Sequence, residues 1–295
     1  MDTLESLKRK IRSADELQSV VRTMKALAAV SIRQYEKAVE SLAHFNRTVL
    51  LGLRAALKNR PRDAAAARPA PEGKLGAIVF GSDQGMCGQL NEQIVSHAIA
   101  GMDELGVGPD QRVVLAVGER AGARIEDSGV PVVDTLAVPS SLAGVTPSVQ
   151  ELVLKIQEWN AAQGIERVVL YYSEQVGAAS YQPATLHLLP VDREWLARLE
   201  EEPWPTHVLP AFTMGFDGLF SALIRQYLFV SLYRAFAESL ASENASRLAA
   251  MQSAERNISE RLGQLHAQFN QQRQTSITEE LLDIVSGFEA LQGAD

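Results

Sequence analysis

The sequence has few of the residues that build disulfide, metal and membrane structures. Its single cysteine, Cys87, excludes an intrachain disulfide and a cysteine-based zinc cluster. Its five histidines are scattered without H-E-x-x-H spacing, so no metal site is predicted. No apolar run reaches about 18 residues, which a membrane-spanning helix would need. The charged residues 1–16 lack the apolar segment of a signal peptide, and we expect a protein of a reducing compartment that does not itself span a membrane.

Proline is absent from both ends of the chain. All twelve prolines lie between Pro61 and Pro210, and glycine is also rare outside this stretch. Because a helix interior tolerates almost no proline, we expect long helices at the two ends and a different structure in the middle. The sequence therefore predicts three parts joined by a linker from Arg60 to Gly73, namely an N-terminal helix 1–60, a central α/β domain 74–210 and a C-terminal helix 211–295.

Charge changes along the chain at similar places. Residues 1–60 carry a net charge of +6, residues 61–210 carry −10 and residues 211–295 carry −4. The whole chain has 28 basic and 36 acidic side chains, a net charge of −8. Proteins that bind nucleic acids usually have a basic balance, so no nucleic-acid partner is predicted.

Apolar or small residues recur in the N-terminal part about every 3.5 residues, from Leu4 to Leu42. This spacing is typical of a left-handed coiled coil and predicts a helix over residues 3–59 that needs a partner helix. The helical pattern from Phe216 to about Leu291 supplies that partner. Seven polar residues, 270–276, interrupt the apolar seam there; they indicate either a contact with another molecule or a solvent-exposed face.

The middle part alternates short apolar runs with helical stretches. This alternation is typical of an α/β domain with a mainly parallel sheet. The expected strands are 75–80, 112–117, 130–133, 167–172 and 185–189, and the expected helices are 90–105, 119–127 and 148–163.

A glycine-rich segment, Gly81 to Asn91, follows the first expected strand and opens a helix, where backbone N–H groups can hold a phosphate. It lacks both the G-x-G-x-x-G pattern and the Gly-Lys-Ser/Thr of a P-loop, which favours a tight turn. Cys87 would need a base to act as a nucleophile, and the nearest in sequence is His97, so a small buried cysteine is the better interpretation. We expect no catalytic, cofactor-binding or metal-binding residue, and a structural or interface role for the turn residues Asp83, Gly85, Cys87 and Gly88.

Three motifs occur in order along the chain. The first is Thr23 to Arg33, similar to A-M-x-M-V-A-A-S-K-M-R, and the second is Ser82 to Asn91, similar to S-D-R-G-L-C-G-G-L-N. The third runs from Ser242 to Gly287; it contains the segments Ser246–Met251, Arg273–Gln274 and Ser276–Leu281. On these motifs the chain resembles the gamma subunits of F-type ATP synthases over nearly its whole length. It departs from them at Ala26, Ser31 and Gln84, where the family motifs have Met, Lys and Arg.

This resemblance implies a rotor. The terminal helices would form an antiparallel coiled coil with an inserted Rossmann-like α/β domain, turning inside a ring of alpha and beta subunits and coupling ion flow to ATP synthesis or hydrolysis. The epsilon subunit and the membrane c-ring would be further partners, at the cytoplasmic face of the inner membrane. The chain would hold no catalytic residue, and 277–291 would be a bearing end. The implied rotor–stator interface comprises Met24, Lys25, Arg247, Arg273, Gln274, Thr278 and Glu280.

Two other functions stay open on the sequence alone. One is a nucleotide-dependent α/β enzyme that uses the segment Gly81–Gly88. The other is a coiled-coil adaptor without an ATPase partner. Long terminal rods count against the enzyme, which would not need them.

Overall fold

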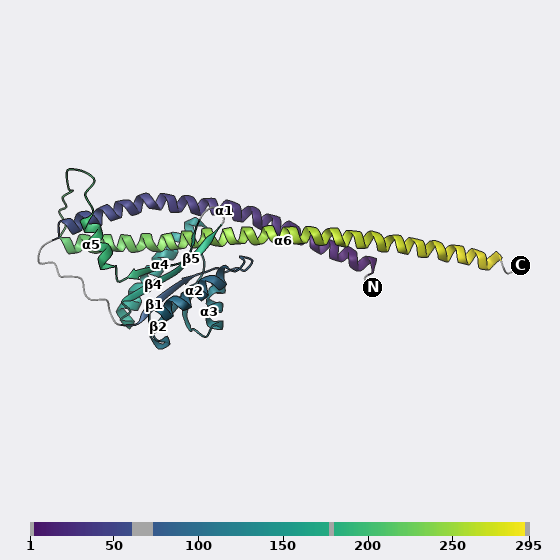
Figure 1. Cartoon of the computed structure of the whole chain (residues 1–295), viewed down its shortest axis with the longest axis horizontal. Helices are drawn as coiled ribbons and strands as arrows, with labels where there is room; N and C mark the ends of the chain where they lie inside the picture. Colours follow the sequence, from purple (N-terminus) through teal and green to yellow (C-terminus); the bar gives the residue numbers. More distant parts are fainter. Residues whose placement is uncertain (1–2, 61–72, 177–179, 293–295) are drawn as a thin grey trace. The chain divides into compact units, whose positions relative to one another are not determined.

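The computed structural model describes residues 3–60, 73–176 and 180–292, with side chains up to residue 286 (Figure 1). Most of the expected linker therefore lies outside the described residues. The chain forms two compact units, residues 28–247 and residues 1–27 with 248–295. The elements are α1 (Leu4–Lys58), β1 (Leu75–Phe80), α2 (Leu90–Glu104), η1 (Pro109–Gln111), β2 (Arg112–Val117), α3 (Glu119–Asp127), β3 (Val132–Leu136), α4 (Leu142–Gln163), β4 (Arg167–Gln175), β5 (Tyr181–Leu189), α5 (Arg193–Glu201) and α6 (Phe216–Gln292).

The larger unit is built on a sheet with the strand order β3-β2-β1-β4-β5. The first four strands are parallel and β5 runs antiparallel to β4, so the prediction of a mainly parallel sheet is confirmed. The chain steps outward from β1 to β3, and α4 then returns it to the other side of β1. This reversal places a topological switch point between β1 and β4, as in Rossmann-like folds.

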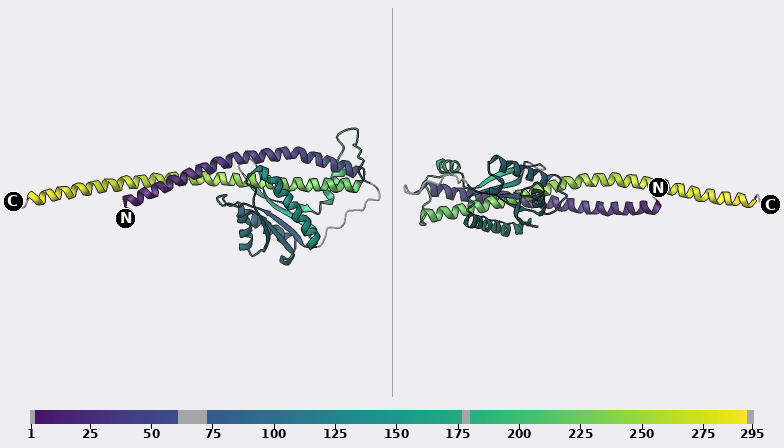
Figure 2. Two further views of the ribbon diagram at one scale, coloured as in Figure 1. Left: turned by 180° about the vertical axis from the view of Figure 1, so that it is seen from behind. Right: turned by 90° about the horizontal axis from the view of Figure 1, so that it is seen from below.

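Each face of the sheet is covered by helices because the parallel strands are apolar on both sides. Residues such as Ala77 and Val79 pack with α2 and α3 on one face. The alternate residues, such as Ile78 and Phe80, pack with α4 and with the N-terminal half of α6 on the other. Figure 2 shows α6 and the C-terminal half of α1 running along this second face.

A third cluster joins α1, α5 and the start of α6. Leu53 of α1 is fully buried against Leu199 of α5 and Leu223 of α6. The helix α5 was not predicted from the sequence. Asp192 begins it by accepting a hydrogen bond from the backbone N–H of Glu194 at 2.9 Å.

In the smaller unit, the start of α1 pairs with the last part of α6. Gln18 donates to Ser259 at 2.9 Å, and the Lys8 ammonium lies 5.8 Å from the centre of the Phe269 ring. Positions that increase along α1 meet positions that decrease along α6, so the predicted antiparallel pairing is confirmed here. The two helices run in the same antiparallel sense in the larger unit, because Gly52 lies against Leu223, whereas Tyr35, earlier in α1, lies beside Glu243, later in α6.

Several predicted boundaries were wrong by a few residues. The third strand is Val132–Leu136 rather than 130–133, and β4 and β5 are longer than expected at the ends that face their hairpin. The largest difference is α4, which begins at Leu142 and contains Pro147. Val145 and Val149 at helical spacing are fully buried, so packing outweighs the cost of the proline. The three-part division 1–60, 74–210 and 211–295 stays a prediction.

Candidate functional site

The glycine-rich turn lies at the carboxyl end of β1, beside the switch point of the sheet. Asn91 holds it from α2, since its side-chain oxygen accepts the Ser82 N–H at 3.0 Å and its amide donates to the Ser82 hydroxyl at 2.8 Å. Gly81 is required here, because a Cβ would lie 2.4 Å from the Cβ of Ala121. The turn is therefore packed closely between α2 and α3.

Asp83 links three strand ends. Its two carboxylate oxygens accept the backbone N–H groups of Glu119 at 3.1 Å and of Val138 at 2.9 Å. Glu119 begins α3, and a helix N-terminus favours a negative charge. The carboxylate thus occupies the position at α3 where a phosphate would otherwise bind, which supports the prediction that the turn binds no nucleotide.

Cys87 and Gly88 lie against α6. The Cys87 thiol is buried 3.4 Å from the Ser82 hydroxyl, and the Cys87 carbonyl accepts a hydrogen bond from Ser246 at 2.5 Å. His97 is engaged elsewhere, with Thr185 at 2.8 Å, which supports the interpretation of Cys87 as a packed residue. Gly88 has a φ of +59°, where a side chain is strained.

Gly85 has no comparable constraint. A Cβ at this position would meet nothing within 4 Å. The neighbouring Met86 has a φ of 63° and is 56% exposed. The tip of the turn is therefore an exposed surface, whereas its two ends are fixed.

Two of the expected interface residues, Met24 and Lys25, lie near the α1–α6 seam of the smaller unit. Lys25 forms an ion pair with Glu255 at 2.5 Å, and Arg22 contacts the other oxygen of the same carboxylate at 3.2 Å. These hydrogen bonds from Lys25 and Arg22 lower the pKa of Glu255. Met24 is half-buried beside them.

The other expected residues of this unit are exposed on α6. They lie where the seam becomes polar, since half-buried Gln272 and Ser276 take the positions that follow Leu262, Leu265 and Phe269. The physical reason is the start of α1 at Leu4, beyond which α6 loses its partner. The exposed candidates are Arg273, Gln274, Thr278 and Glu280.

The last part of α6 also exposes large apolar side chains. Leu282 is 60% and Ile284 is 69% exposed, and Ile277, Leu281 and Val285 are exposed as well. Exposed apolar groups of this kind mark a surface that contacts another molecule. Phe288 and Leu291, which belong to the expected bearing end, lie outside the described side chains.

Arg247 is in a different environment, inside the larger unit. Its side chain is 13% exposed and pairs with Glu243, four residues earlier and 8% exposed, at 2.5 Å. Burial raises the pKa of Glu243, the Arg247 charge opposes this shift, and the nearby Asp83 charge adds to it. The predicted interface set is thus divided between internal ion pairs, at Lys25 and Arg247, and exposed groups near the end of α6.

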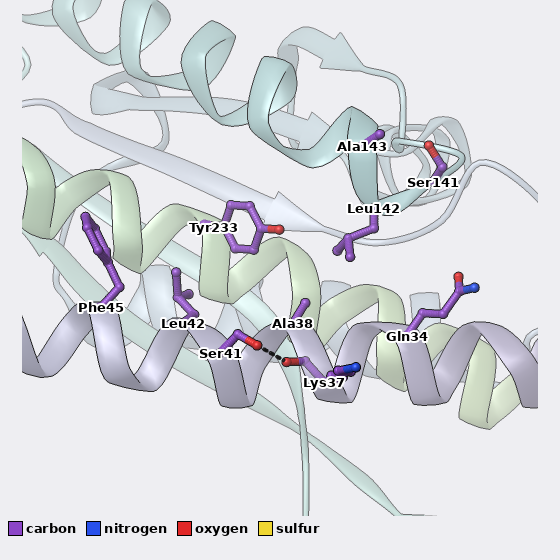
Figure 3. Close-up of a pocket in the computed structure, with 10 residues that line it drawn as sticks. All are labelled: Gln34, Lys37, Ala38, Ser41, Leu42, Phe45, Ser141, Leu142, Ala143 and Tyr233. Atoms are coloured by element: carbon purple, nitrogen blue, oxygen red, sulfur yellow. Dashed lines mark hydrogen bonds between the residues drawn. The ribbon is translucent and has the colours of Figure 1, made fainter.

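The larger unit also has an apolar groove between α1, α6 and the start of α4. Figure 3 shows Leu42 and Phe45 of α1, Leu142 of α4 and Tyr233 of α6 along it. Its volume is about 720 Å³. This groove was not predicted from the sequence, because its residues come from three distant segments.

Among the described residues, no group of three or more His, Cys, Asp or Glu side chains is placed to hold a metal ion. The described helices include none with the length and apolarity needed to cross a membrane.

Known proteins share this architecture. The family described as ATP synthase matches residues 3–291. The chain belongs to the ATP synthase family. Curated relatives from this family include the ATP synthase gamma chain of Nitratidesulfovibrio vulgaris, 27% identical over 99% of this chain and 100% of the relative. The gamma chain of Synechococcus sp. is 29% identical with the same coverage, and the chloroplastic gamma subunit of Zea mays is 28% identical over 99% of this chain and 90% of its own length.

Solved structures show the same fold. The rotor of the Euglena gracilis mitochondrial ATP synthase covers 93% of this chain and 98% of the matched chain, with a TM-score of 0.62 and 20% identity. The central stalk of the Tetrahymena thermophila enzyme covers 80% of this chain and 99% of its own, with a TM-score of 0.56 and 21% identity. The resemblance to gamma subunits of ATP synthases is confirmed, and the α/β fold with two long terminal helices is the fold of this family's stalk subunits.

Proposed function

We propose that this chain is the rotating central stalk of an ATP synthase. The observation that carries the proposal is the antiparallel pair of α1 and α6, in which α6 continues past the start of α1 with exposed polar and apolar side chains. A coiled coil that ended in solvent would not keep Leu282 and Ile284 exposed. A ring of other subunits around the coiled coil would contact these side chains.

The partners follow from this role. The alpha and beta subunits form the catalytic ring around the stalk, and the epsilon subunit and the c-ring lie at its other end. The complex places the chain in its peripheral part, at the cytoplasmic face of the membrane. We further propose that 1–60 and 211–295 form the shaft and that 74–210 forms the domain nearer the membrane.

The stalk acts on catalysis without a catalytic residue of its own. An asymmetric rod presents different side chains to each beta subunit around the ring. Its angle therefore gives each catalytic site a different set of contacts and shifts each toward a different state. By linkage the effect is reciprocal, so ion-driven rotation changes nucleotide affinity, and hydrolysis turns the rod.

Arg273, Gln274 and Thr278 are the proposed latch to a beta subunit. All three are exposed where the seam has lost its apolar residues. A hydrogen bond to a charged group such as the Arg273 guanidinium is worth about 1.5–3 kcal/mol. This is enough to change a two-state balance by about tenfold or more, so a contact made at only some angles biases one site against the others.

Reconstituted alpha–beta–gamma complexes test the latch. Arg273→Ala or Gln274→Leu should leave the chain helical and the complex assembled while steady-state ATP turnover falls. The matched control is Arg261→Ala, which removes an exposed arginine of the same helix that donates a hydrogen bond to Gln264 at 3.1 Å. Turnover equal to wild type in both variants would defeat the latch. Loss of assembly would show that the residues are structural.

A further inference from the structure

A pocket between the helix α2 and the strand β5 takes no part in the proposed stalk role. It has a volume of about 380 Å³, and Tyr171 of β4 forms its floor. The register of β4 and β5 pairs Tyr171 with Thr185, so both lie on the face of the sheet that α2 covers. Concave sites with a few convergent polar groups are the usual positions of small ligands. The other polar side chains that line the pocket are those of His97, Glu104 and His187.

The hydroxyl of Tyr171 is a buried group that the chain leaves unpaired. Tyr171 is 0% exposed, and its hydroxyl has no hydrogen-bond partner among the described residues. Gly101, which also lines the pocket, leaves room for this hydroxyl, because a Cβ there would lie 3.1 Å from the Tyr171 oxygen and 2.8 Å from the ring. Buried polar groups are rarely unpaired in folded proteins, so the hydroxyl indicates a partner that comes from outside the chain.

Two imidazoles line the same pocket, one from each side. His97 of α2 forms a hydrogen bond with the Thr185 hydroxyl at 2.8 Å through its Nε2, and its ring meets the Tyr171 ring edge-on with 6.1 Å between centres. His187 of β5 is exposed at the opposite wall. Since the described residues include no group of three ligands for a metal ion, the imidazoles are available as hydrogen-bonding groups.

The charges around Tyr171 favour a negative group at the floor of the pocket. Burial raises the pKa of Tyr171 to about 12, while the charges of Arg112 and Arg167 oppose this shift and that of Glu104 adds to it. The phenol therefore stays protonated and donates a hydrogen bond, and the two arginines stabilise an anionic acceptor placed against it. Glu104 acts against such an anion, but it is exposed, where water and salt screen its charge.

We infer that this pocket binds one small organic carboxylate. The carboxylate accepts the Tyr171 hydroxyl and the ring N–H groups of His97 and His187, and a short alkyl part lies against Ala100 and Leu105. A bound anion also favours the protonated form of an imidazole, in which both ring nitrogens donate. The inference does not depend on the stalk role, because the described lining residues come from α2 with Leu105 after it, β4 and β5.

Calorimetric titration of the full chain at pH 7 tests the chemistry directly. The probe is n-butyrate, the neutral control of the same shape is n-butyramide, and the cationic control is n-butylammonium, with sodium chloride holding the ionic strength constant. We expect saturable binding of one n-butyrate, at least about tenfold tighter than n-butyramide, because hydrogen bonds to a charged acceptor are the stronger kind. Absence of saturable binding would overturn the inference and leave a water-filled pocket. Binding of either control as tight as that of n-butyrate would also overturn it.

A tyrosine variant locates the site. Tyr171→Phe keeps the ring but removes the hydroxyl, so n-butyrate should bind at least about tenfold more weakly. The melting temperature of the free chain should not fall, because the hydroxyl has no partner there to lose. The matched control is Tyr172→Phe, since Tyr172 packs on the other face of the sheet, and it should leave probe binding unchanged. Wild-type binding in Tyr171→Phe would contradict the proposed site.

A carboxylate variant tests the sign of the ligand charge. Glu104→Gln removes a like charge from the pocket wall, so n-butyrate should bind about twofold or more tightly than it does to wild type. Its control is Glu151→Gln, at an exposed position of α4, which should have no effect. Weaker n-butyrate binding in Glu104→Gln would show that the ligand is not held as an anion.

The assembled complex separates the two sources of the carboxylate. Binding of n-butyrate to the free chain and to the complex alike indicates a small organic acid from solution. Binding to the free chain alone indicates a carboxylate of a neighbouring subunit that fills the pocket on assembly. The stalk role is tested by the turnover of the Arg273→Ala complex, so either proposal can fail without the other.

Discussion

Two stretches of the helix α6 differ sharply in how they are held. In residues 230–246 every side chain is buried except those of Tyr233 and Arg234. In residues 252–286 only Leu262 and Leu265 are buried. The first stretch is enclosed by the sheet, α4 and α1. The second pairs with α1 along one stripe as far as the start of α1 and has no partner helix beyond it. Different contacts therefore stabilise two stretches of one continuous helix, packing on most sides in the first and pairing along one stripe in the second.

The composition of the two stretches follows from this difference. A helix that is enclosed on most sides is largely apolar or small around its circumference, and 235–246 is made mainly of Ala and Ser with a few large residues such as Phe236 and Leu240. Its two buried carboxylates, Glu238 and Glu243, each pair with an arginine four residues away. The serines are paired with the domain, since Ser242 donates to the Ser173 carbonyl at 3.1 Å and Ser239 accepts the Ser173 N–H at 3.3 Å. As far as Ser276 the second stretch is polar outside its stripe, so its stability there comes from pairing along the seam.

The largest expected effect is the loss of a large side chain from the enclosed stretch. Phe236 is 1% exposed and packs edge-on against Phe80, with 5.0 Å between ring centres. Phe236→Ala should lower the free energy of unfolding by about 3–5 kcal/mol, because it leaves a cavity. Phe269→Ala in the second stretch should cost less than half as much, since Phe269 is only half-buried. Urea titrations followed by circular dichroism compare them, and equal losses would remove the distinction.

A smaller effect on the free energy of unfolding is expected when a buried serine of the first stretch loses its hydroxyl. Ser246 donates to the Cys87 carbonyl at 2.5 Å and lies 3.2 Å from the Tyr181 hydroxyl. Ser246→Ala leaves a buried acceptor unpaired, so unfolding should become easier by about 1–3 kcal/mol. Ser259→Ala, at an exposed position that contacts Gln18, should stay within about 0.5 kcal/mol of wild type. If both serine variants unfold at the wild-type midpoint, the hydrogen bond from Ser246 to the Cys87 carbonyl does not contribute to the free energy of unfolding.

The smallest effect concerns pH and the second stretch. Lys25 and Arg22 lower the pKa of Glu255 below its ordinary value of 4.5. A carboxyl whose pKa is lowered by folding stabilises the protein above its unfolded pKa and loses that contribution as the pH falls through its folded pKa. Glu255→Gln should therefore reduce the melting temperature slightly at pH 7. The difference from wild type should disappear in melting curves recorded well below pH 4.5. A difference that persists in acid would assign the effect to packing.

Periodicity explains why the long elements could be predicted from the sequence. The strands β1 and β2 and the helix α3 have the predicted bounds, since each is a continuous apolar run or a clear amphipathic period. Proline and glycine placement predicted the ends of α1 and α6 within a few residues. The start of α4 was missed because Pro147 argues locally against a helix, whereas the burial of Val145 is decided by distant strands.

The sites were harder to predict, because they depend on which distant residues meet. The exposure of Arg273 and Gln274 follows from the polar interruption of the seam, which is visible in one segment. The burial of Arg247 does not, although its spacing from Glu243 on a largely small and apolar stretch was a usable signal. The pocket between α2 and β5 has Tyr171 of β4 as its floor. The sequence shows His97, Tyr171 and His187 but not that they face the same space.

The insertion of the α/β domain between α1 and α6 also has a consequence for biosynthesis. The chain completes α1 at Lys58, but α6 begins only at Phe216. At translation rates of about 5–20 residues per second, roughly 10–30 s pass before the first residue of the partner is made. During this time the seam of α1, including Leu7, Val21 and Ala28, has no helix to cover it. The apolar seam of the nascent α1 therefore stays exposed during this time. Pairing then proceeds from the end of α1 toward its start as α6 is made, because Gly52 near the end of α1 lies against Leu223 near the start of α6.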